Sequence, residues 1–141
     1  DFLRGVTGEN TTILGLGGSD TLQGGDGDDT IIGGADGDVL RGGAGADTFV
    51  FTTADLAAPG DDLKDFSLAQ GDALEFQGLL TGFDGSDLSG HVEIVAQGTL
   101  GAIQIDADGG GDSFVAFGII RNGRNLDAQT MFDDGDLLIT G

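Results

Sequence analysis

Residues 15–50 of this 141-residue chain are four nonapeptides in register: GLGGSDTLQ (15–23), GGDGDDTII (24–32), GGADGDVLR (33–41) and GGAGADTFV (42–50). They follow the template G-G-x-G-x-D-x-U-x, in which U is a large apolar residue, and depart from it only at Leu16 and Asp36. A short fixed period is typical of architectures in which each repeat is one unit stacked on its neighbours. These residues therefore decide the fold.

Each nonapeptide combines a glycine-rich turn with a short strand. The x-U-x strand is too short to be stable alone, so neighbouring copies must stack with each U side chain pointing inward. If every nonapeptide reverses the chain, copies that are 18 residues apart lie on the same side. We therefore expect two parallel sheets, one lined by Ile13, Ile31 and Phe49 and the other by Leu22 and Leu40.

The same spacing stacks the aspartates of the repeats, Asp20 over Asp38 and Asp29 over Asp47. Two carboxylates about 5 Å apart repel each other by about 3 kcal/mol at an effective dielectric constant of about 20. Ca²⁺ removes such repulsion, because it binds about 6–8 oxygen ligands that include the backbone carbonyls of glycine-rich turns. Mg²⁺ fits a mixed cage less well, and Zn²⁺ needs His or Cys, which these turns lack.

We predict two well-formed calcium sites, one between the turns of Asp20 and Asp38 and one between the turns of Asp29 and Asp47. A weaker third site would use residues 6–14, a degenerate repeat with Thr11 at the aspartate position. The alternative, that an aspartate only favours the turn, stays open for the variable positions. The candidate metal-binding residues are Asp20, Asp38, Asp29, Asp47, Gly15, Gly17, Gly24, Asp26, Asp28, Gly33, Ala35, Asp36, Gly42 and Ala44.

The charge balance favours cations as partners. Five Lys and Arg stand against 25 Asp and Glu, giving a net charge of −20, so nucleic acids and anionic membranes are poor partners. No cysteine is present to form a disulfide or a thiolate site, and no apolar run approaches the roughly 18–20 residues of a membrane span. An ion that binds only the folded chain adds about 2.7 kcal/mol per site at a hundredfold excess over Kd. We expect the chain to be unfolded at cytosolic calcium and folded where calcium is abundant.

Residues 52–141 lack the repeat and are expected to form a β-rich region that caps a roll formed by residues 1–51. The joint is predicted to contain Phe49, Phe51, Phe66, Leu74 and Phe76. Hydrophobic alternation and glycine clusters predict the further elements. They are short strands at 63–66 and 74–76, a strand at 91–97 with Val92, Ile94 and Ala96 inward, a hairpin of 102–106 and 113–120, a loop at 54–60, and a helix at 125–132 capped by Asn125.

Two acidic groups lie outside the repeats. Asp61 and Asp65 are alternative calcium ligands at the end of the roll. The segment 106–112 holds three aspartates but lacks the glycine and closing glutamate of an EF-hand, so an acidic hairpin turn is the favoured interpretation.

The sequence contains no catalytic motif. His91 is the only histidine, and neither a G-x-S-x-G nor an H-E-x-x-H pattern is present. The paired carboxylates lack a Trp or Tyr platform that would hold a sugar. We predict no enzyme activity for this fragment, while an upstream catalytic domain stays open.

The nonapeptides resemble the calcium-binding repeats of RTX proteins. The run 42–51, followed by Asp61-x-Leu63-x-Asp65-Phe66 and by 71–76, is similar to the C-terminal region of type I secreted bacterial RTX proteins, including giant adhesins and some hydrolases. This resemblance implies an all-β fold: a right-handed parallel β-roll followed by a mainly antiparallel β cap with at most one short helix. It also implies an uncleaved secretion signal within residues 131–141.

The resulting functional hypothesis is a calcium-dependent folding and type I secretion module of a larger, adhesin-like extracellular or cell-surface protein. Its partners would be calcium ions and, during export, the type I secretion machinery, and the fragment is expected to be monomeric. Residues 1–5 resemble the end of another repeat, so we expect the chain to begin inside a longer array. The alternative is a polysaccharide-binding or stabilising module of a secreted enzyme such as an alginate epimerase, protease or lipase, which the scarcity of basic residues disfavours.

Overall fold

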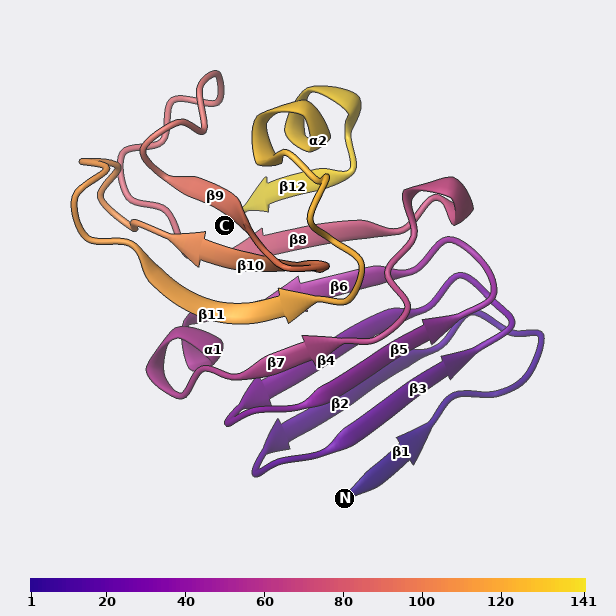
Figure 1. The fold of residues 1–141 in the computed structure, drawn as a ribbon. Helices are drawn as coiled ribbons and strands as arrows, with labels where there is room; N and C mark the ends of the chain where they lie inside the picture. Colours follow the sequence, from indigo (N-terminus) through magenta and orange to yellow (C-terminus); the bar gives the residue numbers. More distant parts are fainter.

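Two β-sheets face each other and run through the whole molecule (Figure 1). The computed structural model describes residues 1–141. The sheets have the strand orders β1-β3-β5-β7-β11-β10-β9 and β12-β8-β6-β4-β2. The strands are β1 (Phe2–Arg4), β2 (Thr12–Gly17), β3 (Thr21–Gly25), β4 (Thr30–Ala35), β5 (Val39–Gly43), β6 (Thr48–Phe51), β7 (Asp61–Leu63), β8 (Ala73–Gln77), β9 (Val92–Gln97), β10 (Leu100–Ile105), β11 (Val115–Ile120) and β12 (Leu137–Thr140).

The repeat strands pair in the predicted register. Ile13 lies beside Ile31 and Ile31 beside Phe49 in one sheet, while Leu22 lies beside Leu40 in the other. All of these pairings are parallel, and all five side chains are buried between the sheets. The predicted parallel roll is thus confirmed.

The C-terminal region extends both sheets. Strand β7 pairs in parallel with β5, and β8 pairs in parallel with β6, so Leu63 continues the row of Leu40 and Leu74 continues the row of Phe49. Strands β9, β10 and β11 are antiparallel, which confirms the predicted hairpin. All five residues predicted for the joint are buried in one core cluster. Within it, the rings of Phe51, Phe76 and Phe117 lie with centroids 5.1–5.9 Å apart.

The prediction of at most one helix is wrong, because two short α-helices are present: α1 (Thr53–Ala57) and α2 (Ala128–Asp134), beside a 3-10 turn, η1 (Leu68–Gln70). Helix α1 occupies the first part of the predicted loop at 54–60, and Thr52 and Asp55 stabilise its start by a reciprocal capping box. No helix reaches the length and apolarity that a bilayer span requires.

Two details of the predicted C-terminal elements also need correction. Helix α2 is capped by Asp127 rather than Asn125, since the Asp127 carboxylate accepts a hydrogen bond from the backbone N–H of Thr130 at 2.8 Å. In β9, Ala96 is exposed rather than inward, because this strand lies at the edge of its sheet.

The two departures from the repeat template keep the backbone conformation of the glycines that they replace. Leu16 has a φ angle of 78° and Asp36 one of 77°. Gly34, which occupies the template position of Leu16 in a later repeat, also has a positive φ angle, of 100°. A left-handed conformation costs a non-glycine residue roughly 1–2 kcal/mol. Asp36 offsets this cost in part, because its carboxylate accepts a hydrogen bond from Gly18 N at 3.2 Å. Leu16 is 75% exposed and its side chain has no such compensation.

We therefore predict that Leu16→Gly raises the free energy of unfolding by about 1 kcal/mol, because the strain at this position disappears. Urea denaturation in calcium measures the change. Asp36→Gly is the matched control: it relieves the same conformation but loses the bond from Gly18, so its gain should be smaller. A loss of stability in Leu16→Gly would contradict the prediction.

Candidate metal centre

One row of aspartates lies at the edge of the roll where β3, β5 and β7 begin. Each carboxylate reaches to the backbone of the preceding layer. Oδ1 of Asp38 accepts a hydrogen bond from Asp20 N at 2.8 Å, and Oδ1 of Asp61 accepts one from Asp38 N at 2.9 Å. The predicted stacking of Asp20 and Asp38 is confirmed, and Asp61 adds a further layer.

A second row lies at the opposite edge, where β4, β6 and β8 begin. Asp29 accepts from Thr11 N at 2.8 Å, Asp47 from Asp29 N at 2.9 Å, and Asp72 from Asp47 N at 3.0 Å. The predicted stacking of Asp29 and Asp47 is confirmed as well. Thr11 has the expected place of an aspartate in the degenerate first turn.

The second oxygen of most ladder carboxylates indicates a metal site. Oδ2 of each ladder aspartate except Asp72 is buried and has no hydrogen-bond partner, and these residues are at most 6% exposed. Leaving a charged oxygen unpaired in this way costs several kcal/mol unless a counter-ion compensates. The unpartnered oxygens are Oδ2 of Asp20, Asp29, Asp38, Asp47 and Asp61.

Small residues keep the space beside these oxygens open. A Cβ atom at Gly24, Gly33 or Gly42 would overlap with the carboxylate of the aspartate five residues later. The carbonyl oxygen of Gly33 faces Gly15 in the adjacent turn, and that of Gly42 faces Gly24. Hard oxygen donors of both kinds, carboxylate and carbonyl, thus line the turns, and this donor set fits Ca²⁺.

The variable aspartates differ from one another. Asp28 joins two turns by accepting from Ala46 N at 2.8 Å, as Asp36 does with Gly18 N. Asp26 is exposed and makes no hydrogen bond through its side chain. Of the remaining candidates, Gly17 and Ala44 are exposed, and Ala35 is half-buried at the end of β4.

Sequence reasoning missed Asp72 as a ladder residue, and it grouped Asp61 with Asp65. Asp65 instead follows β7 at the far end of that strand, where its carboxylate accepts from Gly42 N and Gly43 N at 2.9 and 3.1 Å. The last ladder steps span 23 and 25 residues rather than 18. The available signal was an aspartate two residues before a buried leucine, Asp61 before Leu63 and Asp72 before Leu74, which is the spacing found in the repeats.

Burial and mutual repulsion perturb the ladder carboxylates. Burial is the main cause that raises the pKa of Asp38 and of Asp72, against the lowering effect of the backbone hydrogen bonds. Burial, together with the neighbouring carboxylates Asp72 and Asp29, raises the pKa of Asp47 to about 6. Burial together with Asp55 raises the pKa of Asp61 to about 8. The metal-free ladder therefore resists carrying its full negative charge.

We predict that metal-free protein gains β-structure when the pH is lowered from about 8 to about 5. Carboxyl groups of the unfolded chain have a pKa near 4 and have released their protons in this pH range, whereas the folded chain still holds some because its pKa values are raised. The folded state therefore loses stability as the pH rises through this window. Circular dichroism of protein stripped of divalent ions measures the effect. A weaker β-signal at pH 5 than at pH 8 would contradict it.

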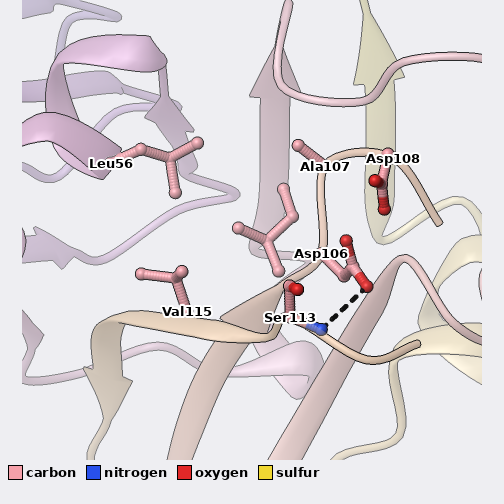
Figure 2. Close-up of a pocket in the computed structure, with 7 residues that line it drawn as sticks. Leu56, Asp106, Ala107, Asp108, Ser113 and Val115 are labelled. Atoms are coloured by element: carbon pink, nitrogen blue, oxygen red, sulfur yellow. Dashed lines mark hydrogen bonds between the residues drawn. The ribbon is translucent and has the colours of Figure 1, made fainter. Parts of the chain in front are cut away.

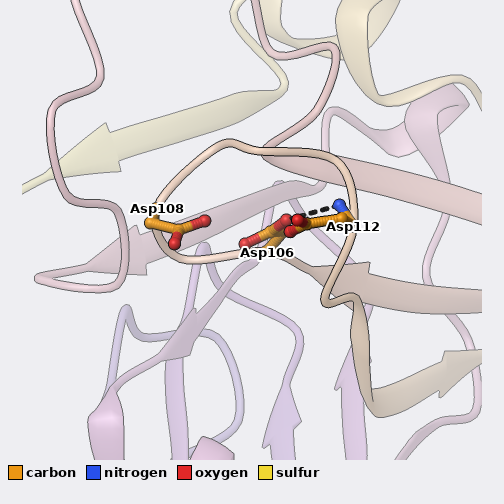
Figure 3. A group of neighbouring side chains, drawn as sticks. All are labelled: Asp106, Asp108 and Asp112. Atoms are coloured by element: carbon orange, nitrogen blue, oxygen red, sulfur yellow. Dashed lines mark hydrogen bonds between the residues drawn. The ribbon is translucent and has the colours of Figure 1, made fainter.

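The hairpin between β10 and β11 carries the other acidic group, with side-chain oxygens of Asp106, Asp108 and Asp112 within 4.8 Å of one another (Figure 3). Asp106 is buried, and its Oδ2 accepts from Asp112 N at 3.0 Å and from Ser113 N at 3.2 Å. Asp106 lines a cavity of about 300 Å³. Figure 2 shows Leu56 of α1 and Val115 across from Asp106 among the residues that line it. Backbone hydrogen bonds account for this cluster as a turn.

His91 is a packing residue directly before β9. Its ring contacts Phe83 edge-on with centroids 5.5 Å apart, and it lies against Gly109. Its Nδ1 is buried without a hydrogen-bond partner. The ring is thus fixed by the hairpin and by Phe83.

Comparison with known proteins agrees with this geometry. The sequence model described as the RTX calcium-binding nonapeptide repeat (4 copies) matches residues 14–49. A comparison with curated protein sequences gives no significant match.

Two solved structures resemble the whole chain, both from the Azotobacter vinelandii mannuronan C5-epimerase. The AlgE6R2 subunit is 28% identical with a TM-score of 0.62, and the alignment covers 99% of this chain and 87% of that one. The AlgE6R3 subunit is 28% identical with a TM-score of 0.57, covering 98% and 78%. Residues 14–49 are therefore RTX calcium-binding nonapeptide repeats, within a chain whose fold is similar to the R-modules of this epimerase.

Proposed function

We propose that this chain is a calcium-folded module of a secreted protein, comparable to the R-modules of the epimerase, and that it has no catalytic role of its own. The observation that carries this proposal is the row of buried, unpartnered carboxylate oxygens at both edges of the roll. The nearly complete alignment with AlgE6R2 and AlgE6R3 favours a module attached to a secreted enzyme over an adhesin.

The ladder residues explain the calcium dependence. When bound, calcium supplies the positive charge that stacked carboxylates require. Asp20 and Asp38 would hold one ion together with carbonyls of their turns, and Asp29 and Asp47 would hold another. In the absence of ions these residues repel one another within a chain of net charge −20, and this repulsion opposes folding.

The two parts of the chain would then have different tasks. Residues 1–51 form the calcium-dependent roll, and residues 52–141 cap it and carry the secretion signal near 131–141. The cap stabilises the roll through Phe51, which packs against Phe76 and Phe117. A chain that folds only at extracellular calcium passes through a type I export channel unfolded and folds outside the cell.

A calcium titration followed by circular dichroism tests the proposal. We expect a coil-like spectrum without calcium and a cooperative gain of β-structure at roughly millimolar calcium, the range of extracellular calcium modules. Asp29→Ala and Asp47→Ala should each shift the midpoint upward roughly fivefold or more, because losing a charged partner costs at least about 1 kcal/mol. Asp26→Ala, an exposed turn position, is the control. A folded spectrum that ignores calcium would overturn the proposal.

A second function, binding of an anionic polysaccharide, is favoured by the arrangement of the basic residues. Arg4, Gln23 and Arg41 are paired across β1, β3 and β5. The next two positions of this row are Lys64 and Arg121, whose backbone N–H groups bond to Leu40 O and Leu63 O. Four of the five basic side chains therefore share one row on the outer face of the sheet, which extends over about 19 Å at the usual strand spacing.

The surrounding charges determine how strong such binding is. Lys64 and Arg121 both pair with Asp62 at 2.6 Å, which leaves Arg4 and Arg41 without an ion pair. Burial alone would raise the pKa of Asp62, but the hydrogen bonds and charges of Arg121 and Lys64 hold it below its usual value. The row therefore suits a weak, salt-sensitive contact with an extended uronate chain.

Calorimetry with polymannuronate in calcium tests this second function. We expect binding at low salt that weakens as salt is added, and a loss of roughly two- to fivefold in affinity for Arg41→Ala, the usual contribution of an exposed charge. Arg124→Ala, outside the row, should bind like the unmodified chain. Equal losses in the two variants, or no binding at low salt, would exclude the row as the site.

A further inference from the structure

Two buried carboxylates meet at the edge of the roll that helix α1 covers, outside the nonapeptides. Asp55 lies in α1 and Asp61 begins β7, and each residue is 1% exposed. One oxygen of each is bonded: Oδ2 of Asp55 accepts from Thr52 N at 2.6 Å and from Thr52 Oγ1 at 3.0 Å, while Oδ1 of Asp61 accepts from Asp38 N. The other oxygens, Oδ1 of Asp55 and Oδ2 of Asp61, have no partner.

These two unpartnered groups face each other. The side chain of Asp61 lies within hydrogen-bonding range of that of Asp55, and the charge of Asp38 adds to their repulsion. Oδ2 of Asp38 is likewise buried without a partner. The carboxylates of Asp55 and Asp61 thus lie together, with Asp38 in the next layer of the ladder.

No basic side chain neutralises this group. The ion pairs of the molecule join the N-terminal amine to Asp20, and Lys64 and Arg121 to Asp62. Asp62 alternates with Asp61 along β7, so its two cations lie on the outer face of the sheet. The protein therefore offers no positive charge to the carboxyl groups beneath α1.

The opposite edge of the roll shows how the same ladder position is satisfied without an ion. Asp72 is the last aspartate of its row, as Asp61 is of the other. Its Oδ1 accepts from Asp47 N at 3.0 Å, and its Oδ2 accepts from Ser67 N at 2.8 Å. At that edge the connection through η1 presents an N–H donor, whereas the connection through α1 presents the carboxylate of Asp55.

We propose that Asp55 and Asp61 form an additional divalent cation site that fastens helix α1 to the roll. The donors are all carboxylate oxygens, which hard cations prefer, and buried charges of one sign require such a partner. The identification of the ion as Ca²⁺ rests on the proposed function, while the site itself rests on the unpartnered oxygens of Asp55 and Asp61.

Counting bound calcium tests the site. We expect Asp55→Asn to bind one calcium ion fewer per chain than the unmodified protein, measured by native mass spectrometry and equilibrium dialysis of the full 141-residue chain. The asparagine oxygen keeps the bond from Thr52 N, and its amide group can donate to Asp61 in place of the ion. The number of calcium ions taken up on folding, obtained from the dependence of stability on calcium concentration, should fall by one as well. Asp61→Asn, which keeps the bond from Asp38 N, is the second variant with the same expectation.

Asp127→Asn is the matched control, because it removes one charge from the capping residue of the other α-helix, and it should leave the count unchanged. If the unmodified chain binds calcium and both site variants bind as many ions, the site is overturned while the proposed function stands. If the unmodified chain binds no calcium, the proposed function fails, and the calcium assignment of this site fails with it.

Discussion

The structure depends on the stacking of like-charged carboxylates in a parallel roll. Parallel stacking at a strand spacing of about 4.8 Å packs the leucine and phenylalanine rows between the sheets, and it also brings successive aspartates together at both edges. The hydrophobic gain and the electrostatic cost come from the same geometry and cannot be separated. Each Oδ1 is used to bond the neighbouring layer, and the Oδ2 of every ladder aspartate except Asp72 is left without a partner in the protein.

The C-terminal region continues this architecture without repeating its sequence. Leu63 and Leu74 extend the two buried rows, and Asp61 and Asp72 extend the two ladders. The phenylalanine group around Phe51 then closes the core where β9, β10 and β11 turn antiparallel. Apolar contacts therefore close the capped end of the molecule, while buried carboxylates line its two edges.

Much of the roll could be predicted from the residues because, with a strict period, the register of one strand pair also fixes the register of every other pair of repeat strands. The buried rows of Ile31 and Leu40 and the pairs of stacked aspartates followed directly from the spacing of 18. The region after residue 51 was less predictable. Helix α1 depends on a capping box between Thr52 and Asp55, a local signal that a run of small residues beside Pro59 conceals.

The repeat period, the sheet that each repeat strand joins and the chemistry of the ladder follow from residue type and spacing alone. That Asp72 completes one ladder, and that Asp61 meets Asp55 at the end of the other, becomes visible only in the folded molecule. This is because α1 and η1 lengthen the connections to 23 and 25 residues, so the period is lost along the chain although the layers still stack in space.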